Sequence, residues 1–401
     1  MIAACPFPVN YGSPAAIREL SATLSEMGHD IHIVTYPHGQ DISVGKARLH
    51  RVAENRPAGS FSAGPSGEKL YFDFLMLGEL HKTIRQEKID IIHAHNYEGA
   101  LIGIFGKFVT GKPLIYQSVS LMADELASYR FIRPAFIAQW LGKFLDWAVP
   151  LFPNYIITVS QELYDYLANH GVPKKKLAMI TSGITPAMFE NVDSNRFREK
   201  YGIGARPVVM YTGITNAFQR VDYQLRAFSL VLQEVPSAVC MIVSPLEKEP
   251  DLPLLQALAQ ELKITDNVIF VGPHSLEDLP DYLAMATVTV APRPECPGHP
   301  IKLLNYMISG KPIVCFEGGA KGLAHMRDAL VVPDHDWQAM GKAIVQFLND
   351  PALAERLGAN ARQNAIDNFD WRAVSQKVAV IYEKLMNRAA GNAIKGILEE
   401  N

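Results

Sequence analysis

The sequence repeats one pattern in both of its halves, in which short apolar runs alternate with amphipathic segments of helical length. This alternation is typical of a parallel β-sheet whose two faces are both covered by helices. In the first half we expect strands near 1–4, 30–36, 89–95, 113–118, 154–160 and 177–182, and helices near 14–28, 68–87, 98–110, 134–149 and 161–170. In the second half we expect strands near 207–213, 238–244, 267–272, 288–292, 312–316 and 329–333, and helices near 222–234, 252–263, 276–285, 302–309 and 322–327. The predicted fold class is therefore α/β, with two doubly wound halves.

The boundary between the halves falls in 186–206, a polar stretch with Gly and Pro residues and no strand pattern. A chain of 401 residues also favours two domains over one. We predict a first domain over 1–190, a second over 205–370, and a carboxyl-terminal helix and tail over 371–401.

The composition narrows the function classes. A formal net charge of −3 and 20% charged residues give an ordinary surface, which does not indicate a nucleic-acid partner. The four cysteines are scattered and match neither a CxxC metal pattern nor a disulfide framework, so we expect a cytoplasmic location. No apolar run of about 18 residues occurs, and the first residues do not resemble a signal peptide. The first apolar run is shorter than the roughly five residues usual for a strand, so a start upstream of Met1 is a further expectation.

Loops at the carboxyl ends of parallel strands are where such folds bind ligands. Gly12 follows the first expected strand and opens the first helix, so its turn could place backbone amides against a phosphate or a sugar. The following Ser13 and Pro14 equally suit a helix cap and first-turn pair, and the sequence leaves both interpretations open.

Residues 294–314 are more informative, because a Pro/Gly-broken loop there leads into a helix that Gly310 ends. The amides of the first helical turn suit a diphosphate, and Lys302 could neutralise it. Glu295 could accept hydrogen bonds from sugar hydroxyls, and Asn305 could reach a ribose or a base. The alternative is that Lys302 and Asn305 are simply solvated.

The segments 298–314 ("GHPIKLLNYMISGKPIV") and 211–231 resemble the donor-binding half of retaining glycosyltransferases with the GT-B fold, family 4. Residues 12–35 and 154–189 resemble the first half of the same family. The resemblance implies two Rossmann-like domains facing a cleft, with the carboxyl-terminal helix crossing back to the first domain. It also implies transfer of a sugar from a nucleotide-sugar donor to a hydroxyl of a polysaccharide or glycolipid type of acceptor, with retained configuration and without a metal or cofactor.

The chain departs from the family at several positions. The family's pair of glutamates falls on Pro297 and Asn305, and its Arg and Lys, which clasp the diphosphate, fall on Ile214 and Gln219. Its histidine near the reacting carbon falls on Val119.

The candidate residues follow from these matches and from the strand-end positions. The catalytic candidates are Gly12, His95 and Glu295, although a strand-end histidine such as His95 is more often a packed residue. The donor-binding candidates lie in the second half and are Gly213, Arg220, Glu295, His299, Pro300, Ile301, Lys302, Leu303, Asn305, Gly318 and Gly319. The "DHD" at 334–336 resembles a metal-binding Asp-x-Asp, but it opens a helix, so we interpret its acids as helix caps and predict no metal.

Two alternatives remain. The altered residues would also fit a non-catalytic GT-B subunit that binds or assembles with an active transferase. Residues 129–153 are rich in aromatic side chains with a few basic ones, so they would suit either a membrane surface, near a carbohydrate or lipid-linked acceptor, or a buried packing helix.

Overall fold

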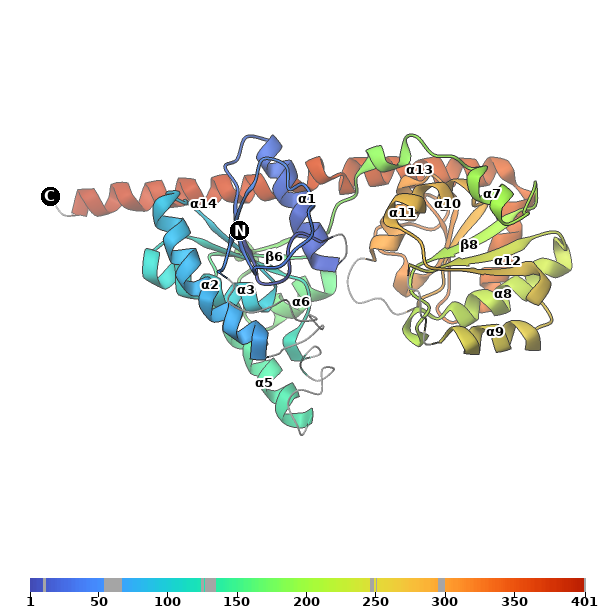
Figure 1. Cartoon of the computed structure of the whole chain (residues 1–401), viewed down its shortest axis with the longest axis horizontal. Helices are drawn as coiled ribbons and strands as arrows, with labels where there is room; N and C mark the ends of the chain where they lie inside the picture. The colour runs from blue at the N-terminus through green and yellow to red at the C-terminus, as the bar shows by residue number, and fades with distance from the viewer. Residues whose placement is uncertain are drawn as a thin grey trace. The chain divides into compact units, whose positions relative to one another are not determined.

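Contacts along the chain define two units, one formed by Met1–Gly183 with Trp371–Asn401 and the other by Ile184–Asp370 (Figure 1). The computed structural model describes residues 1–9, 12–53, 67–123, 126, 135–245, 249, 251–294 and 300–399. The units are continuous with each other at residues 183–184 and 370–371, so the first unit takes both ends of the chain.

The first unit contains a parallel sheet in the order β3-β2-β1-β4-β5-β6-β7. Most of its strands are buried along their whole length, as expected for a parallel sheet that is covered on both faces. The bounds are β1 Ile2–Ala3, β2 His32–Thr35, β3 Arg48–Arg51, β4 Ile92–His95, β5 Leu114–Ser118, β6 Tyr155–Thr158 and β7 Leu177–Met179. The sequence analysis missed β3, because this edge strand is polar and its two terminal residues are exposed.

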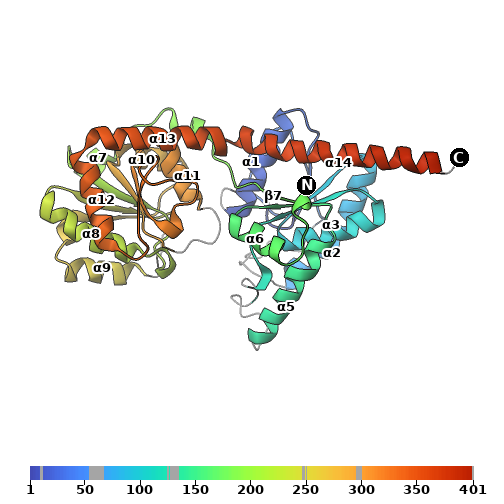
Figure 2. The ribbon, with the colours of Figure 1, turned by 180° about the vertical axis from the view of Figure 1, so that it is seen from behind.

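Helices cover both faces of this sheet. Their bounds are α1 Gly12–Glu26, α2 Gly67–Gln86, α3 Asn96–Thr110, α5 Ala135–Ala148, α6 Gln161–Asn169 and α14 Trp371–Glu399, with short 3₁₀ turns η1 Val149–Leu151 and η2 Lys174–Lys176. Helices α1 and α14 share one apolar core with the sheet, which includes Ile17, Leu24, Val378 and Leu385. The predicted return of the last helix to the first domain is therefore confirmed, and both ribbon views show α14 running beside α1 (Figure 2).

The second unit contains another parallel sheet, in the order β10-β9-β8-β11-β12-β13. Its strands are β8 Val208–Thr212, β9 Val239–Val243, β10 Val268–Val271, β11 Val288–Ala291, β12 Ile313–Phe316 and β13 Leu330–Val332. Alternate side chains of each strand enter two separate apolar cores, one on each face, as Met210 and Val209 do. The predicted α/β class with two doubly wound halves is confirmed.

The helices of the second unit are α7 Arg196–Lys200, α8 Val221–Glu234, α9 Leu252–Glu261, α10 Leu279–Met285, α11 Ile301–Ile308, α12 Trp337–Asn349 and α13 Pro351–Phe369. Its 3₁₀ turns are η3 Pro186–Phe189, η4 Ala217–Gln219, η5 Thr265–Asn267, η6 Leu276–Asp278 and η7 Glu317–Gly319. The expected boundary segment packs into this unit, since Phe189, Phe197 and Ile203 are buried in its core. The expected helix at 322–327 is wrong, because the chain forms turns there. Within the described part of the chain, no helix is both long and apolar enough to cross a bilayer.

Candidate functional site

The candidate site in the second unit lies where the strand order reverses. The chain moves outward in one direction from β8 to β10 and in the other from β11 to β13, so β8 and β11 are neighbours at the switch point. Loops at the carboxyl ends of two such strands diverge and leave room for a ligand. The loop after β8 leads to η4 and α8, and the loop after β11 leads to α11.

Lys302, in the first turn of α11, is the centre of a polar network. Its Nζ donates to the hydroxyl of Tyr211 at 2.6 Å and to Oε1 of Gln219 at 2.8 Å. The Tyr211 hydroxyl donates in turn to the carbonyl oxygen of Ile214 at 2.6 Å. Burial raises the pKa of Tyr211 well above its ordinary value, with Tyr306 and Glu249 adding to the effect, so the phenol stays neutral. The network therefore keeps a positive charge at the start of a helix.

Gly213 makes room for this charge. Its backbone has a φ of +123°, and a Cβ added there would lie 3.0 Å from the Lys302 Nζ. The two residues were proposed separately from the sequence, and the structure brings them together. Ile214 and Gln219, the two positions that depart from the family's basic pair, also belong to the network, as a carbonyl and an amide acceptor.

Arg220 has a different set of partners. Its Nε and Nη2 each donate to an Asp222 carboxylate oxygen at 2.9 Å, and its guanidinium stacks 3.7 Å from the ring of Tyr223. The bond to Asp222 raises the pKa of Arg220 further above its already high value. The structure thus holds the Arg220 side chain in a local ion pair at the start of α8.

Arg293 is a cation that the sequence analysis overlooked. It follows β11, and its guanidinium stacks on the ring of Phe218 at 3.5 Å. Its charge acts to lower the pKa of Tyr211, against the larger effect of burial, so Arg293 lies close to the Lys302 network. The two cations also line the same small cavity of about 20 Å³. The position of Arg293 directly after a buried strand was the sequence signal that could have identified it.

The first residues of α11 have distinct environments. Ile301 is exposed and Asn305 is half-buried one turn later, on the same side of the helix as Lys302. Leu303 is fully buried in the core, and its N–H donates to the carbonyl oxygen of Pro300 at 2.9 Å. Asn305 is therefore partly accessible to solvent, whereas the side chain of Leu303 is not.

Two further candidates, Glu295 and His299, lie outside the described residues, as does Pro297. In the sequence the three positions fall between β11 and α11. Their predicted roles remain predictions.

Gly318 and Gly319 are explained by contacts within the chain. A Cβ on Gly318 would overlap the carbonyl oxygen of Pro294, and one on Gly319 would lie 2.5 Å from the carbonyl oxygen of Arg293. The two glycines let η7 pack against the loop that carries Arg293. A substitution at either glycine would therefore also displace the loop that carries Arg293.

The acidic residues at 334–336 serve as hydrogen-bond acceptors. Asp336 caps α12 by accepting from the N–H of Ala339 at 2.8 Å, so the predicted cap is confirmed. Asp334 accepts from the N–H of Gly318 at 2.9 Å.

The catalytic candidates with described positions lie in the first unit. Gly12 begins α1, as expected. His95 ends β4, is buried, and stacks on His93 with 4.4 Å between ring centroids. Burial and the neighbouring His93 hold the pKa of His95 well below its ordinary value, so the ring is neutral. Its Nε2 is buried without a hydrogen-bond partner in the described part of the chain.

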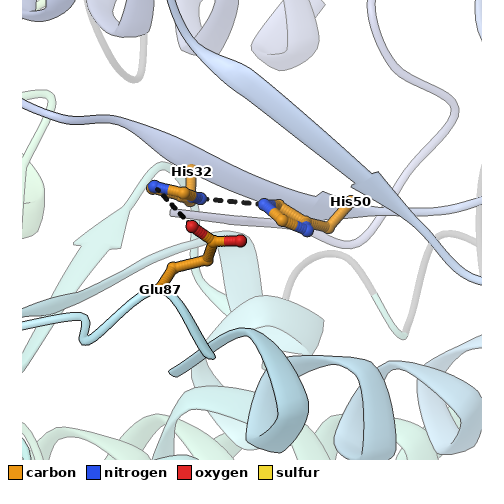
Figure 3. Close-up of side chains that lie close together, drawn as sticks. All are labelled: His32, His50 and Glu87. Atoms are coloured by element: carbon orange, nitrogen blue, oxygen red, sulfur yellow. Dashed lines mark hydrogen bonds and ion pairs between the residues drawn. The ribbon is translucent and has the colours of Figure 1, made fainter. Parts of the chain in front are cut away.

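A second polar cluster, not foreseen from the sequence, lies at the start of β2 (Figure 3). His32 Nδ1 and His50 Nε2 are 2.8 Å apart, and His32 Nε2 lies 3.9 Å from a carboxylate oxygen of Glu87. Arg48 already pairs with Glu87 at 3.4 Å and with Asp30 at 2.6 Å. A metal ion would compete with Arg48 for these oxygens, so the cluster is best described as an ion-pair network.

Comparison with known proteins covers nearly the whole chain. Residues 12–187 match the family described as Glycosyltransferase Family 4, and residues 193–364 match Glycosyl transferases group 1. The MMP alpha-(1->4)-mannosyltransferase of Mycolicibacterium hassiacum is 24% identical over 94% of this chain and 96% of its own.

Two solved structures share the fold. Sucrose-phosphate synthase from Thermosynechococcus elongatus has a TM-score of 0.74 at 20% identity and covers 94% of each chain. HepE of Anabaena, solved with UDP, has a TM-score of 0.71 at 15% identity over 94% of this chain and 98% of its own.

Proposed function

Because the chain belongs to the group 1 glycosyltransferases of the GT-B fold, we propose that its second unit binds the diphosphate of a nucleotide-sugar donor at Lys302. The chain is a glycosyltransferase, and the acceptor in our proposal is a hydroxyl of a carbohydrate or lipid-linked sugar. The UDP bound by HepE supports a nucleoside diphosphate as the leaving group.

The observation that carries this proposal is the Lys302 network at the start of α11. An ammonium held by the Tyr211 hydroxyl and the Gln219 amide is fixed before a ligand arrives. The positive end of the helix dipole acts at the same point, and both favour an anion. Asn305, one turn further on, offers an amide donor and acceptor to a ribose hydroxyl.

We propose Arg293 as the second cation of the diphosphate site. Arg220 was the first expectation, but a diphosphate would have to compete with Asp222 for its guanidinium. Arg293 stands beside the Lys302 network and its guanidinium stacks on an aromatic ring, and a planar guanidinium matches the geometry of a bidentate bond with phosphate. Two cations from the chain neutralise a diphosphate without a metal ion, which is why we keep the proposal of a metal-independent and cofactor-independent reaction.

In the proposed mechanism the configuration at the sugar is retained and no protein nucleophile is needed. Lys302 and Arg293 stabilise the negative charge that develops on the leaving diphosphate. The bond between the sugar carbon and the diphosphate oxygen breaks, and the oxygen of the acceptor hydroxyl bonds to that carbon on the same face. An oxygen of the departing diphosphate takes the proton of the acceptor hydroxyl. In the proposal Glu295 holds the sugar, the turn at Gly12 lies beside the reacting carbon, and His95, at the end of β4, contacts the ligand.

The test measures release of nucleoside diphosphate by the full chain from a panel of UDP-, GDP-, ADP- and dTDP-sugars with simple glycoside acceptors. We expect release with one base, lost in Arg293→Met and largely kept in Arg220→Met. The reverse order would restore Arg220 as the second cation. A folded protein that binds no nucleotide and releases none would favour the non-catalytic subunit that the residues at 214, 219 and 119 suggest.

A cytoplasmic location stays part of the proposal, since the active sugar donors that it requires are nucleotides. A contact between residues 129–153 and a membrane surface also stays a proposal at this stage.

A further inference from the structure

Helix α5 is fixed to the first unit along one side. Ala138 is fully buried, and Gly142 packs so closely on the backbone of Ala123 that a side chain could not fit. Asp146, also buried, accepts from the N–H groups of Met122 at 2.8 Å and Ala123 at 3.0 Å. These residues are four apart, so they define the inner face of the helix.

The opposite side of α5 is aromatic and exposed. Phe136, Trp140, Phe144 and Trp147 follow one another at spacings of four, four and three residues. Phe136 is 70% exposed and Trp140 is 68% exposed, and the other two are also classed as exposed. The ring centroids of Trp140 and Phe144 are 6.2 Å apart, and those of Phe144 and Trp147 are 6.0 Å apart. The helix therefore carries a second apolar side that the described residues of its own unit leave exposed.

This side continues onto neighbouring elements. Leu151 and Phe152 of the turn after α5 are exposed, and the ring of Phe152 contacts that of Phe108 at 5.7 Å. Phe108 and Val109, in the last turn of α3, are exposed as well. We call this surface the aromatic face, and its members are Phe108, Val109, Phe136, Trp140, Phe144, Trp147, Leu151 and Phe152. In both views α5 projects on the side of the first unit away from α14 (Figures 1 and 2).

The charges next to the aromatic face are mainly basic, although Lys112 lies 4.0 Å from the exposed carboxylate of Asp90. In the described stretches 99–123 and 135–161 the one acidic residue is Asp146, and it is buried on the inner side. The basic residues there are Lys107, Lys112 and Lys143, of which Lys143 is exposed on α5 itself. Lys176 lies near enough to Lys107 to lower its pKa, after the larger effect of burial.

We propose that the aromatic face binds the surface of an anionic phospholipid bilayer, with its rings at the boundary between head groups and acyl chains. Tryptophan is enriched at that depth because its ring is apolar and its N–H is polar. The lysines would face the phosphates, and each basic residue close to such a surface adds attraction. The same charges argue against a second copy of the chain as the occupant, because two such faces would bring Lys143 and Lys107 of each copy together, and Asp90, an exposed acid nearby, pairs with Lys112 of its own chain.

The proposal does not depend on the donor chemistry, so it is tested with the full chain and vesicles alone. Vesicles of phosphatidylcholine with phosphatidylglycerol are compared with vesicles of phosphatidylcholine, by flotation. Binding to the first at low salt, with a blue shift in tryptophan fluorescence, is expected. Trp140 and Trp147 are exposed on the aromatic face, whereas Trp371 is 8% exposed and Trp337 is half-buried in the second unit. Loss of the shift in a variant without Trp140 and Trp147 would therefore assign it to the aromatic face.

The variants separate the apolar and charged contributions. Trp140→Ser with Trp147→Ser should lower the partition coefficient about tenfold for each tryptophan. Lys143→Gln should lower it about fivefold, and on the anionic vesicles alone. Leu254→Ser removes an equally exposed apolar side chain from α9 of the second unit and should change nothing. Thermal unfolding of each variant checks that it is folded.

Results of two kinds would overturn the proposal, one concerning vesicle binding and the other concerning the oligomeric state. One is a wild-type chain that stays unbound on anionic vesicles, or a folded double-tryptophan variant that binds as well as the wild type. The other is a wild-type dimer in which Trp140 is shielded from a soluble quencher without lipid and which the tryptophan substitutions convert to a monomer, since a second copy would then occupy the face.

Discussion

Replacement of Lys302 by methionine tests the donor site most directly. Methionine has a similar length and lacks the ammonium, so the change removes the donor to Tyr211 and Gln219 together with the charge. The Tyr211 hydroxyl keeps its bond to the Ile214 carbonyl oxygen, so the fold should survive with a loss of about 1 kcal/mol. A charge-assisted bond to a diphosphate is worth about 1.5 to 3 kcal/mol, so Kd for the nucleoside diphosphate should rise about 10- to 150-fold.

Thermal unfolding with a panel of nucleoside diphosphates measures this effect. At a ligand concentration of about 100 times the wild-type Kd, the ligand stabilises the wild type by about 2.7 kcal/mol. If Kd rises about 100-fold, the same concentration stabilises the variant by about 0.4 kcal/mol.

Tyr211→Phe is the matched control, since it keeps the charge of Lys302 and removes one of its hydrogen bonds. It should weaken binding less than Lys302→Met does. A folded Lys302→Met protein with the full ligand-induced shift would refute the assignment of this lysine to the diphosphate.

Three other changes test the structure around the sites. Asp146→Asn sets an amide N–H₂ group among buried donors and should lower the free energy of unfolding in urea by about 2 to 4 kcal/mol, whereas the exposed Asp41→Asn should stay within about 0.5 kcal/mol. Burial lowers the pKa of His93 to about 3, so the unfolded chain takes up its proton first as the pH falls below 6.5. This group should therefore cost about 2 kcal/mol of stability between pH 7 and pH 5, and His93→Gln should show a correspondingly smaller loss over that range. Gly318→Ala should displace the loop at Pro294. It should therefore weaken nucleotide binding by a larger free energy than it takes from the stability measured in urea. Unchanged binding would contradict the packing that we describe.

The sequence predicted the elements whose pattern comes from burial on both faces. Continuous apolar runs such as β9 and β12 were found because they have no polar side to disguise them. The edge strand β3, "RLHR", was missed for the opposite reason. The expected helix at 322–327 does not form. Local hydrogen bonds hold the chain in turns there instead, because the Asp328 carboxylate accepts from the N–H of Ala324 and from Arg327.

The sequence predicted the location of the candidate site, but it did not predict which side chains pair with one another there. The start of α11 followed from its loop and its glycine stop, which put Lys302 in the first turn of a helix from the sequence alone. Which cation stands beside it depends on side-chain pairing, since Asp222 holds Arg220 while Phe218 holds Arg293. No one-dimensional pattern carries that information.

The return of α14 to the first unit has a consequence for synthesis on the ribosome. The core beneath α1 contains Val374, Val378 and Leu385, so this layer stays open until almost the whole chain has been made. The second unit, Ile184–Asp370, is continuous and can finish first. At about 5 to 20 residues per second the first sheet would wait on the order of 10 to 40 s for its last helix. A nascent chain that stops before residue 371 would present that bare apolar layer to chaperones and proteases.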